Sequence, residues 1–285
     1  KIHVDKDNNL IATYNVKAKS QLQIQATGSV KLTTKQINID NGGEFADIPN
    51  NLKGEYTKSE KYWESDLDVI KNIAENLYLK DQNVSKNAKQ IYDYLVNNFE
   101  YNLDVQNQSY IDRKGAAYTI TSREAIACME FTDTFVAIAR AMGIPAKEIN
   151  GYAIAQDNNP LLPTSVNFKN GDLLHSWPMY YDPNFGWVQI DPTWGNTSKM
   201  DYFTKLDTNH FALVIRGINS EYPLPAGMYR TSEETKLLNI DFANKNGEFI
   251  TNITAKKVFN FSPIHFFLGY NRYEITNTGN TIVYD

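Results

Sequence analysis

The chain has 285 residues, of which 42% are hydrophobic and 21% charged, and its formal net charge is −5. This balance is ordinary for a globular protein, and no cluster of basic residues suggests a surface for nucleic acid. No apolar stretch reaches the roughly 18 residues that a membrane-spanning helix needs. Cys128 is the single cysteine, so an intrachain disulfide and a metal site built from several thiolates are both excluded.

Strand patterns open the chain. Residues 10–16 and 21–34 alternate apolar and polar side chains and are rich in Val, Ile and Thr, which predicts β-strands. The Gly-, Asn- and Pro-rich residues 38–54 predict a loop. The first residue is Lys1 and no signal-peptide core precedes the strands, so we interpret the sequence as a piece of a longer protein. We expect an extracellular or cell-envelope location, with any signal or anchor outside these residues.

Two amphipathic helices are predicted next. Apolar side chains recur every three or four positions in residues 65–79 and again in residues 85–99. Ser65 or Asp66 is the expected cap of the first helix, and Ser85 is the expected cap of the second.

Cys128 opens the clearest helix pattern of the chain. A polar segment at about residues 100–120, typical of a long loop, precedes it. Residues 121–124 have the form of a capping box, so we expect a short helical turn at about residues 122–126, then a break, then the main helix from Cys128. Gly143 ends that helix. At a helix N-terminus, the positive end of the dipole favours the thiolate, which is the reactive form of cysteine.

Four strand patterns follow the helix. They are "AKEINGYAIA", "LLHSWPMYY", "GWVQIDPTW" and "HFALVIRG", with Gly, Asn and Pro between them. His175 lies in the middle of the second strand, and Asp191 ends the third. If these two strands pair antiparallel, the imidazole and the carboxylate come within hydrogen-bond reach across the ladder. After a Pro- and Gly-rich join at residues 221–230, the chain is again strand-like from about residue 233, which is typical of an incomplete β-sandwich.

A thiol, an imidazole and a carboxylate are the three parts of a nucleophilic triad. The imidazole takes the proton of the thiol, and the carboxylate fixes the orientation of the imidazole. Taken singly, Cys128 also fits an inert buried thiol, His175 a core histidine, and Asp191 a residue that starts a turn. Their occurrence together, on a helix start and two consecutive strands, favours the catalytic interpretation.

These residues lie in segments that resemble the transglutaminase-like superfamily. The matching stretches are "CMEFTDTFVAIARAMGIPAKEINGYA", "HSWPMYY" and "GWVQIDPTWG", and the resemblance covers about residues 65–217. It implies that Cys128 is the nucleophile, His175 its base and acid, and Asp191 the residue that orients the histidine. The family often has glycine one or two positions before the cysteine, where this chain has isoleucine and alanine.

The resemblance also implies an α+β fold with a papain-like core, in which a helix packs on an antiparallel sheet. We place this catalytic core at residues 61–222. An N-terminal β-rich segment, residues 1–60, and a C-terminal β-rich segment, residues 223–285, are expected to flank it.

The chemistry implied by the resemblance is acyl transfer on an amide bond of a protein or peptide substrate, through a thioester on the cysteine. Water resolves the thioester in a cysteine peptidase or amidase, which is the function we favour for this prokaryotic-looking chain. A lysine amine resolves it in a crosslinking protein-glutamine gamma-glutamyltransferase. The alternative from another class is a catalytically silent scaffold or adhesion module of the cell surface.

Aromatic side chains near the triad are candidates for substrate contacts. Trp177 and Trp194 are expected to line a substrate groove, since aromatic walls exclude water from the reacting bond. Tyr118, upstream of the nucleophile, is a candidate hydrogen-bond donor to the oxyanion. His210 is interpreted as a structural or surface residue. We expect no metal, no cofactor and no nucleic-acid partner.

Overall fold

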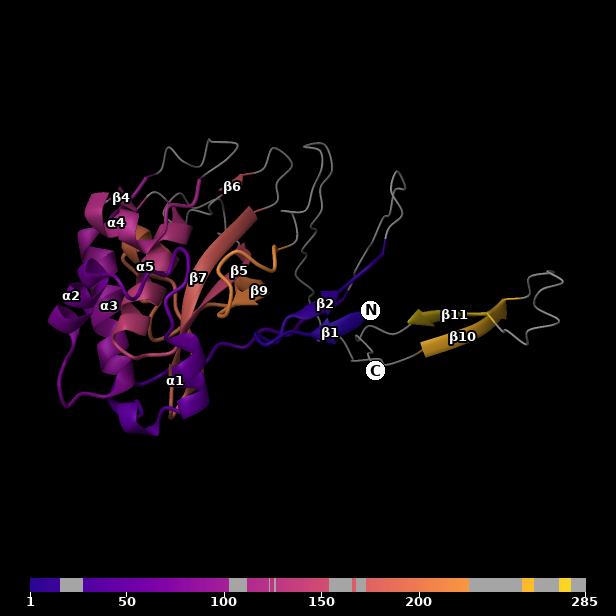
Figure 1. The fold of residues 1–285 in the computed structure, drawn as a ribbon, viewed down its shortest axis with the longest axis horizontal. Coiled ribbons are helices and arrows are strands. Elements are labelled where there is room, and N and C mark those ends of the chain that lie inside the picture. The colour runs from indigo at the N-terminus through magenta and orange to yellow at the C-terminus, as the bar shows by residue number, and fades with distance from the viewer. Residues whose placement is uncertain are drawn as a thin grey trace. The chain divides into compact units, whose positions relative to one another are not determined.

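The chain divides into two compact units (Figure 1). The computed structural model describes residues 1–15, 28–102, 112–122, 124–125, 127–153, 166–167, 173–225, 253–258 and 272–277. The smaller unit consists of Lys1–Asp5, Leu10–Leu32 and Ile240–Asp285, and the larger unit of Lys6–Asn9 and Thr33–Asn239. The division predicted from the sequence, at residues 60 and 222, stays a prediction.

The smaller unit contains two antiparallel strand pairs among its described residues. In the first, β1 (Ile2–Val4) pairs with β2 (Leu10–Ala12). In the second, β10 (Ile253–Val258) pairs with β11 (Arg272–Asn277) (Figure 1). Strand pairing near both ends of the chain agrees with the β-rich flanks predicted from the sequence.

The strand predictions for the N-terminal residues are confirmed only in part. Residues 10–12 form a strand, whereas residues 28–34 are described and form none. Alternation of apolar and polar side chains predicts a strand only where a neighbouring strand completes its hydrogen bonds. Residues 16–27, and most of the segment predicted as an incomplete β-sandwich, lie outside the described residues.

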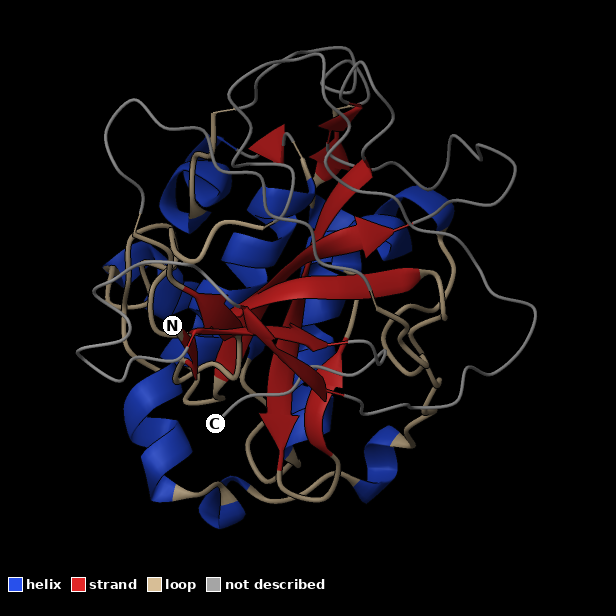
Figure 2. Cartoon of the chain, turned by 90° about the vertical axis from the view of Figure 1, so that its right-hand side faces the viewer, coloured by secondary structure: helices blue, strands red, loops and turns tan. Residues whose placement is uncertain are grey.

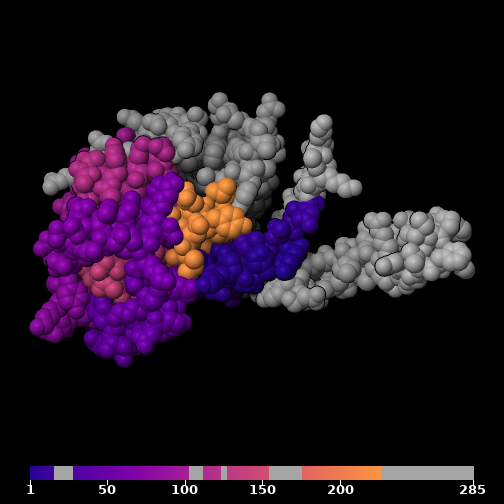
Figure 3. Space-filling model, in the orientation of Figure 1, coloured from indigo at the N-terminus to yellow at the C-terminus, as the bar shows by residue number. Residues whose placement is uncertain are grey.

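The larger unit contains a layer of helices. These are α1 (Asn50–Tyr56), α2 (Asp68–Leu77), α3 (Val84–Asn98), α4 (Ala116–Ser122), α5 (Cys128–Ala141) and α6 (Pro192–Ser198), with two short 3₁₀ turns at Ile39–Asn41 and Phe45–Asp47. On the face seen in Figure 3, the purple and magenta atoms of elements that precede α5 form most of the coloured surface of this unit. Among the described residues, no helix has the length and apolar character required to cross a bilayer.

A five-stranded antiparallel sheet lies against the helices (Figure 2). Its strands are β5 (Ala146–Ala153), β6 (Val166–Asn167), β7 (Leu173–Asp182), β8 (Gly186–Gln189) and β9 (His210–Arg216). The order is β6-β7-β5-β9, and β8 pairs with the last four residues of β7. Apart from this sheet, β3 (Glu100–Tyr101) and β4 (Glu124–Ala125) form a short parallel pair. The α+β fold with a helix on an antiparallel sheet is thus confirmed.

Helix α5 lies at the centre of the larger unit and packs directly on β7. It is buried nearly all round, as its sequence, apolar on most sides, requires. The largest fully buried side chains of the surrounding core are Trp63, Ile70, Ile91, Leu95, Phe131, Phe135, Ile138, Ile144, Tyr180 and Phe203. Each such side chain contributes about 1.5–3 kcal/mol of transfer free energy on burial. This packing fixes the start of α5 relative to the sheet.

The helices predicted at residues 65–79 and 85–99 are confirmed as α2 and α3, but the predicted caps are wrong. Leu67 precedes α2 without a side-chain hydrogen bond. Asn83 caps α3 by accepting a hydrogen bond from the Lys86 backbone N–H at 2.8 Å. Ser85 instead donates to the carboxylate of Asp182 at 2.6 Å. A tertiary partner on β7 therefore takes the hydroxyl that the local pattern assigns to a cap.

The loop predicted at residues 100–120 is wrong where it overlaps β3 and α4, and residues 103–111 lie outside the described residues. The start of α4 is stabilised from a distance, because the Glu64 carboxylate accepts the N–H groups of Ala116 and Ala117 at 3.1 and 3.3 Å. A carboxylate at a helix N-terminus replaces a local cap. The loop predicted at residues 38–54 likewise contains both 3₁₀ turns and the start of α1.

A buried ion cluster joins α5 to β5. The Arg113 guanidinium contacts Asp133 on α5, with Nε 2.8 Å from Oδ2, and Glu148 on β5, with a terminal nitrogen 2.9 Å from Oε2. Both carboxylates are fully buried. The indole N–H of Trp63 also donates to Asp133 at 2.9 Å. Arg113 thus forms an ion pair with one carboxylate on each side of the central packing interface.

We predict that Arg113→Ala lowers the free energy of unfolding by about 3–5 kcal/mol, because it leaves buried Asp133 without its ion-pair partner and Glu148 with only the more distant Arg216, at 3.7 Å. Lys61→Ala is the control, since Lys61 and Glu221 pair at 2.7 Å with side chains 57% and 55% exposed. That change is expected to cost less than about 1 kcal/mol. Urea denaturation at neutral pH measures both, and similar losses in the two variants would contradict the prediction.

Candidate active site

Cys128 is the first residue of α5, as predicted. Ala127 precedes the helix with φ −148° and ψ 179°, an extended conformation that any residue adopts, so a glycine is not required here. The Ala127 side chain offers no cap, but its backbone N–H donates to the Glu130 carboxylate at 2.9 Å. This is one half of a capping box. The helical turn predicted at residues 122–126 is wrong, because α4 ends at Ser122 and β4 follows.

The Cys128 thiol lies between the start of α5 and strand β7. Its Sγ accepts a hydrogen bond from the Ser176 backbone N–H at 3.3 Å, and the residue is fully buried. The N-terminal end of α5 presents the positive end of its helix dipole at this position. Both features stabilise negative charge on the sulfur.

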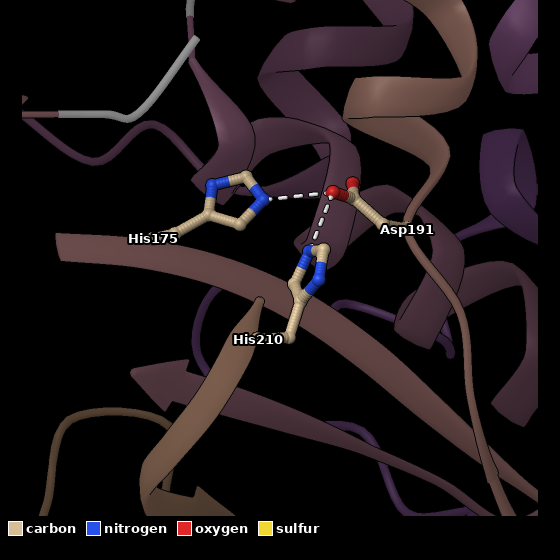
Figure 4. Close-up of side chains that lie close together, drawn as sticks. All are labelled: His175, Asp191 and His210. Carbon is tan, nitrogen blue, oxygen red and sulfur yellow. Dashed lines mark hydrogen bonds and ion pairs between the residues drawn. The ribbon is translucent and has the colours of Figure 1, made fainter. Parts of the chain in front are cut away.

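His175 and Asp191 are hydrogen-bonded to each other. The Nε2 atom of His175 lies 2.8 Å from Oδ2 of Asp191, and both residues are buried (Figure 4). The predicted hydrogen-bond reach is confirmed, but the predicted route across the ladder is wrong. Strand β8 ends with Gln189, which pairs with Met179. Asp191 therefore lies beyond the paired residues and reaches the imidazole from the start of α6.

Asp191 is the N-cap of α6. Its Oδ1 accepts the backbone N–H groups of Thr193 and Trp194 at 2.8 and 3.0 Å. Pro192 occupies the first helical position, where its missing N–H has no cost. The strand predicted through residue 194 is thus wrong after Gln189, since an Asp-Pro pair begins a helix as readily as it ends a strand.

The pair carries opposite charges. Burial lowers the pKa of His175, but the charges of Asp191 and Cys128 outweigh burial and raise it to about 9. Burial raises the pKa of Asp191, but the two neighbouring histidines outweigh burial and hold it well below its usual range. The other imidazole nitrogen, Nδ1 of His175, is buried and forms no hydrogen bond with a nitrogen or oxygen atom of the described residues. A side-chain contact with Cys128 also raises the pKa of His175.

Residues 71–192 match the transglutaminase-like superfamily. The matched range includes Cys128, His175 and Asp191, with the geometry described above. The resemblance to that superfamily predicted from the sequence is thus confirmed over these residues. The match supports a thiol-dependent enzyme as the general class of the transglutaminase-like core.

One curated relative matches part of the chain. Over 170 residues, or 54% of this chain, the sequence is 28% identical to YebA of Bacillus subtilis (strain 168), an uncharacterized protein. The matched part of the chain spans 21% of the length of YebA. The match therefore concerns one part of that longer protein.

Solved structures with a similar fold include two bacterial proteins. A candidate cysteine protease from Cytophaga hutchinsonii is 21% identical, with a TM-score of 0.43, over 60% of this chain and 48% of that one. The periplasmic domain of TgpA from Pseudomonas aeruginosa is 14% identical, with a TM-score of 0.35, over 53% of each chain.

Two tryptophans of the transglutaminase-like core hold the His175 ring. Trp177 and Trp194 stack on it with centroid separations of 5.8 and 5.2 Å, and both are fully buried. The Trp177 indole N–H donates to the Gln189 side chain at 3.0 Å. Gly151 makes room for this wall, because a Cβ there would lie 2.5 Å from the Trp177 ring. The tryptophans fix the plane of the imidazole, and their predicted contact with substrate stays a prediction.

Tyr118 lies on α4 and is 42% exposed. Its ring contacts the Lys114 ammonium, 5.9 Å from the ring centroid. No contact among the described residues joins it to Cys128. Its role as an oxyanion donor stays a prediction.

His210, interpreted from the sequence as structural or surface, is a buried neighbour of the site (Figure 4). Its Nε2 lies 3.2 Å from Oδ2 of Asp191, so this oxygen faces two imidazoles. Local pattern gives no signal for this contact, because it depends on the register of β9 against β5. The short segment "DTNH", with Asp207 three residues before His210, is the one local hint.

The two Nε2 atoms and Oδ2 of Asp191 form the group of potential metal ligands among the described residues, all within 4.8 Å of one another. The separations of 2.8 and 3.2 Å from each nitrogen to the oxygen are those of hydrogen bonds. The group is also completely buried. We therefore interpret the cluster as hydrogen-bonded rather than as a metal site.

We predict that the free energy of unfolding falls as the pH rises into the alkaline range, because His175 loses its proton there. An unfolded histidine has a pKa of about 6.5, and the pKa of folded His175 is raised to about 9. The protonated ring therefore stabilises the fold fully below about pH 6.5, and this contribution is lost as the pH rises through about 9. Urea denaturation of the wild type and His175→Gln across this range measures it. A constant difference between the two proteins would contradict the prediction.

Proposed function

We propose that this chain is a thiol-dependent acyl-transfer enzyme that acts on amide bonds of a protein or peptide, as a cysteine peptidase or amidase. Cys128 is the nucleophile, His175 the base and acid, and Asp191 the residue that orients the histidine. The observation that supports the proposal is one imidazole with Nε2 held by a carboxylate and the thiol of a helix N-terminus beside it.

In the first half of the reaction, the Cys128 thiolate attacks the carbonyl carbon of the amide. A C–S bond forms, and the electron pair of the C=O bond moves to the oxygen. When the tetrahedral intermediate collapses, the C–N bond breaks and the His175 imidazolium gives its proton to the leaving amine. The products of this half are a free amine and a thioester on Cys128.

In the second half, neutral His175 takes a proton from water as the oxygen attacks the thioester carbonyl. The C–S bond then breaks, which releases a carboxylic acid and restores the thiolate–imidazolium pair. Asp191 keeps Nε2 of His175 protonated throughout, so the free nitrogen Nδ1 is the one that exchanges the proton. The two tryptophans limit rotation of the ring between these steps.

Hydrolysis and transamidation share every step up to the thioester. The triad therefore does not separate a peptidase or amidase from a protein-glutamine gamma-glutamyltransferase. We favour water as the acceptor. The extracellular or cell-envelope location stays a prediction.

The deciding experiment incubates the protein with a glutamine-containing acceptor protein and a fluorescent primary amine. We expect peptide fragments or released ammonia without amine incorporation, and a loss of at least about 10³-fold in Cys128→Ala. Amine incorporation that disappears in the same variant would instead establish transamidation.

A substrate-independent measurement accompanies this assay. Iodoacetamide is expected to alkylate Cys128 faster at neutral pH than it alkylates glutathione, and His175→Gln should slow the reaction. Asp182→Asn is a matched control, because Asp182 is a buried acid on β7 that bonds Ser85 and not the thiol. Alkylation no faster than that of glutathione, without turnover of either substrate, would support a catalytically silent scaffold.

A further inference from the structure

His210 lies between two carboxylates. Its Nε2 faces Oδ2 of Asp191 at 3.2 Å, and its Nδ1 faces Oδ1 of Asp207 at 2.7 Å (Figure 4 shows the first contact). The His210 side chain is fully buried, whereas that of Asp207 is 30% exposed. One of these carboxylates also holds His175.

The protons of this arrangement can be counted. An ionised carboxylate only accepts hydrogen bonds, and a neutral imidazole has a single N–H to donate. Both ring nitrogens of His210 face carboxylate oxygens, so the two contacts are hydrogen bonds together only if the ring carries both protons. A neutral ring would direct a nitrogen lone pair at one of the carboxylates.

We propose that His210 is a positioning residue: a doubly protonated imidazole, held by Asp207, that fixes Asp191 against His175 and moderates the negative charge that His175 feels. The role in catalysis rests on the proposed function, whereas the charge on His210 does not. Asp207 lies outside the triad and sets the charge of the ring that contacts it.

The surroundings of the ring support this charge. The ionisable groups in contact with it are Asp191, Asp207, His175 and Tyr202. Burial lowers the pKa of His210, but the hydrogen bonds and charges of Asp191 and Asp207 outweigh burial and raise it. Burial raises the pKa of Tyr202, so its phenol stays neutral. Two anions therefore face the ring, with His175 as the competing cation.

The indole rings of two tryptophans hold His210 in place. Trp194 and Trp177 meet its ring edge to face, with centroid separations of 4.5 and 5.0 Å. The same tryptophans stack on His175. The two imidazoles thus share one aromatic enclosure, which excludes water from the oxygen that both contact.

The consequence for His175 has a definite sign. Asp191 raises the pKa of His175, and a positive charge on His210 offsets part of that effect. Removal of the His210 charge therefore raises the pKa of His175 further. His210→Gln tests this, because the amide N–H of glutamine still donates to Asp191 but carries no charge.

The first test reads the charge directly. The chain has 4 histidines, so the ring nitrogens of the ¹⁵N-histidine-labelled protein are assignable through His210→Gln. At neutral pH, both His210 nitrogens are expected to resonate as protonated. In Asp207→Asn, the ring is expected to lose its second proton at a pH lower by about one unit. A lone-pair nitrogen signal from His210 in the wild type would overturn the proposal.

The second test measures the effect on the thiol. The rate at which iodoacetamide alkylates Cys128 is followed against pH, and its upper inflection reports loss of the His175 proton. We expect this inflection to rise by about half a unit or more in His210→Gln. An unchanged inflection in a folded variant would overturn the positioning role.

The two proposals fail in different ways. If His210 is doubly protonated but Cys128 has ordinary reactivity, the proposed function is contradicted and the proposed charge on His210 is supported. If Cys128 is reactive but His210 is neutral, only the proposal about His210 is contradicted. Should His210→Gln not fold, Asp207→Asn carries both measurements, since its side chain is partly exposed.

Discussion

Asp191 uses its two carboxylate oxygens for two different tasks, and the site depends on that division. Oδ1 accepts the first free N–H groups of α6, while Oδ2 faces His175 and His210. The helix cap fixes the carboxylate in one orientation, so the oxygen that meets the imidazole is placed by backbone geometry. Because α6 packs on α3 and α5, that orientation is tied to the helical layer.

Consecutive residues of β7 position the proposed base and contact the thiol. His175 directs its side chain to Asp191, and the next backbone N–H, that of Ser176, donates to Sγ of Cys128. Successive residues of a strand offer different groups to its two sides. The distance from thiol to imidazole therefore depends on how α5 packs on β7. The buried cluster of Arg113, Asp133 and Glu148 joins α5 to the neighbouring strand β5 and supports that packing.

Short-range patterns predicted the elements that carry the site, whereas contacts between distant residues were not predictable. The start of α5 at Cys128 and the strand around His175 follow from apolar spacing and from Gly and Pro positions. The distant cap of α4 by Glu64 and the contact of His210 with Asp191 depend on tertiary structure. Asp191 was correctly predicted as the hydrogen-bond partner of His175. The sequence predicted, however, that Asp191 lies in a paired strand, whereas the pairing of β8 with β7 ends at Gln189.

Because the site is completely buried, its charges interact strongly, and each charge needs a partner that compensates it. A charge that is removed from water is stable only if a partner compensates it. The low effective dielectric constant inside a protein strengthens each such contact. Around Asp191 two cations would face one carboxylate, which leaves one positive charge to be balanced elsewhere. Asp207, whose side chain is partly exposed, supplies that second negative charge at His210, so two carboxylates balance the two imidazoles.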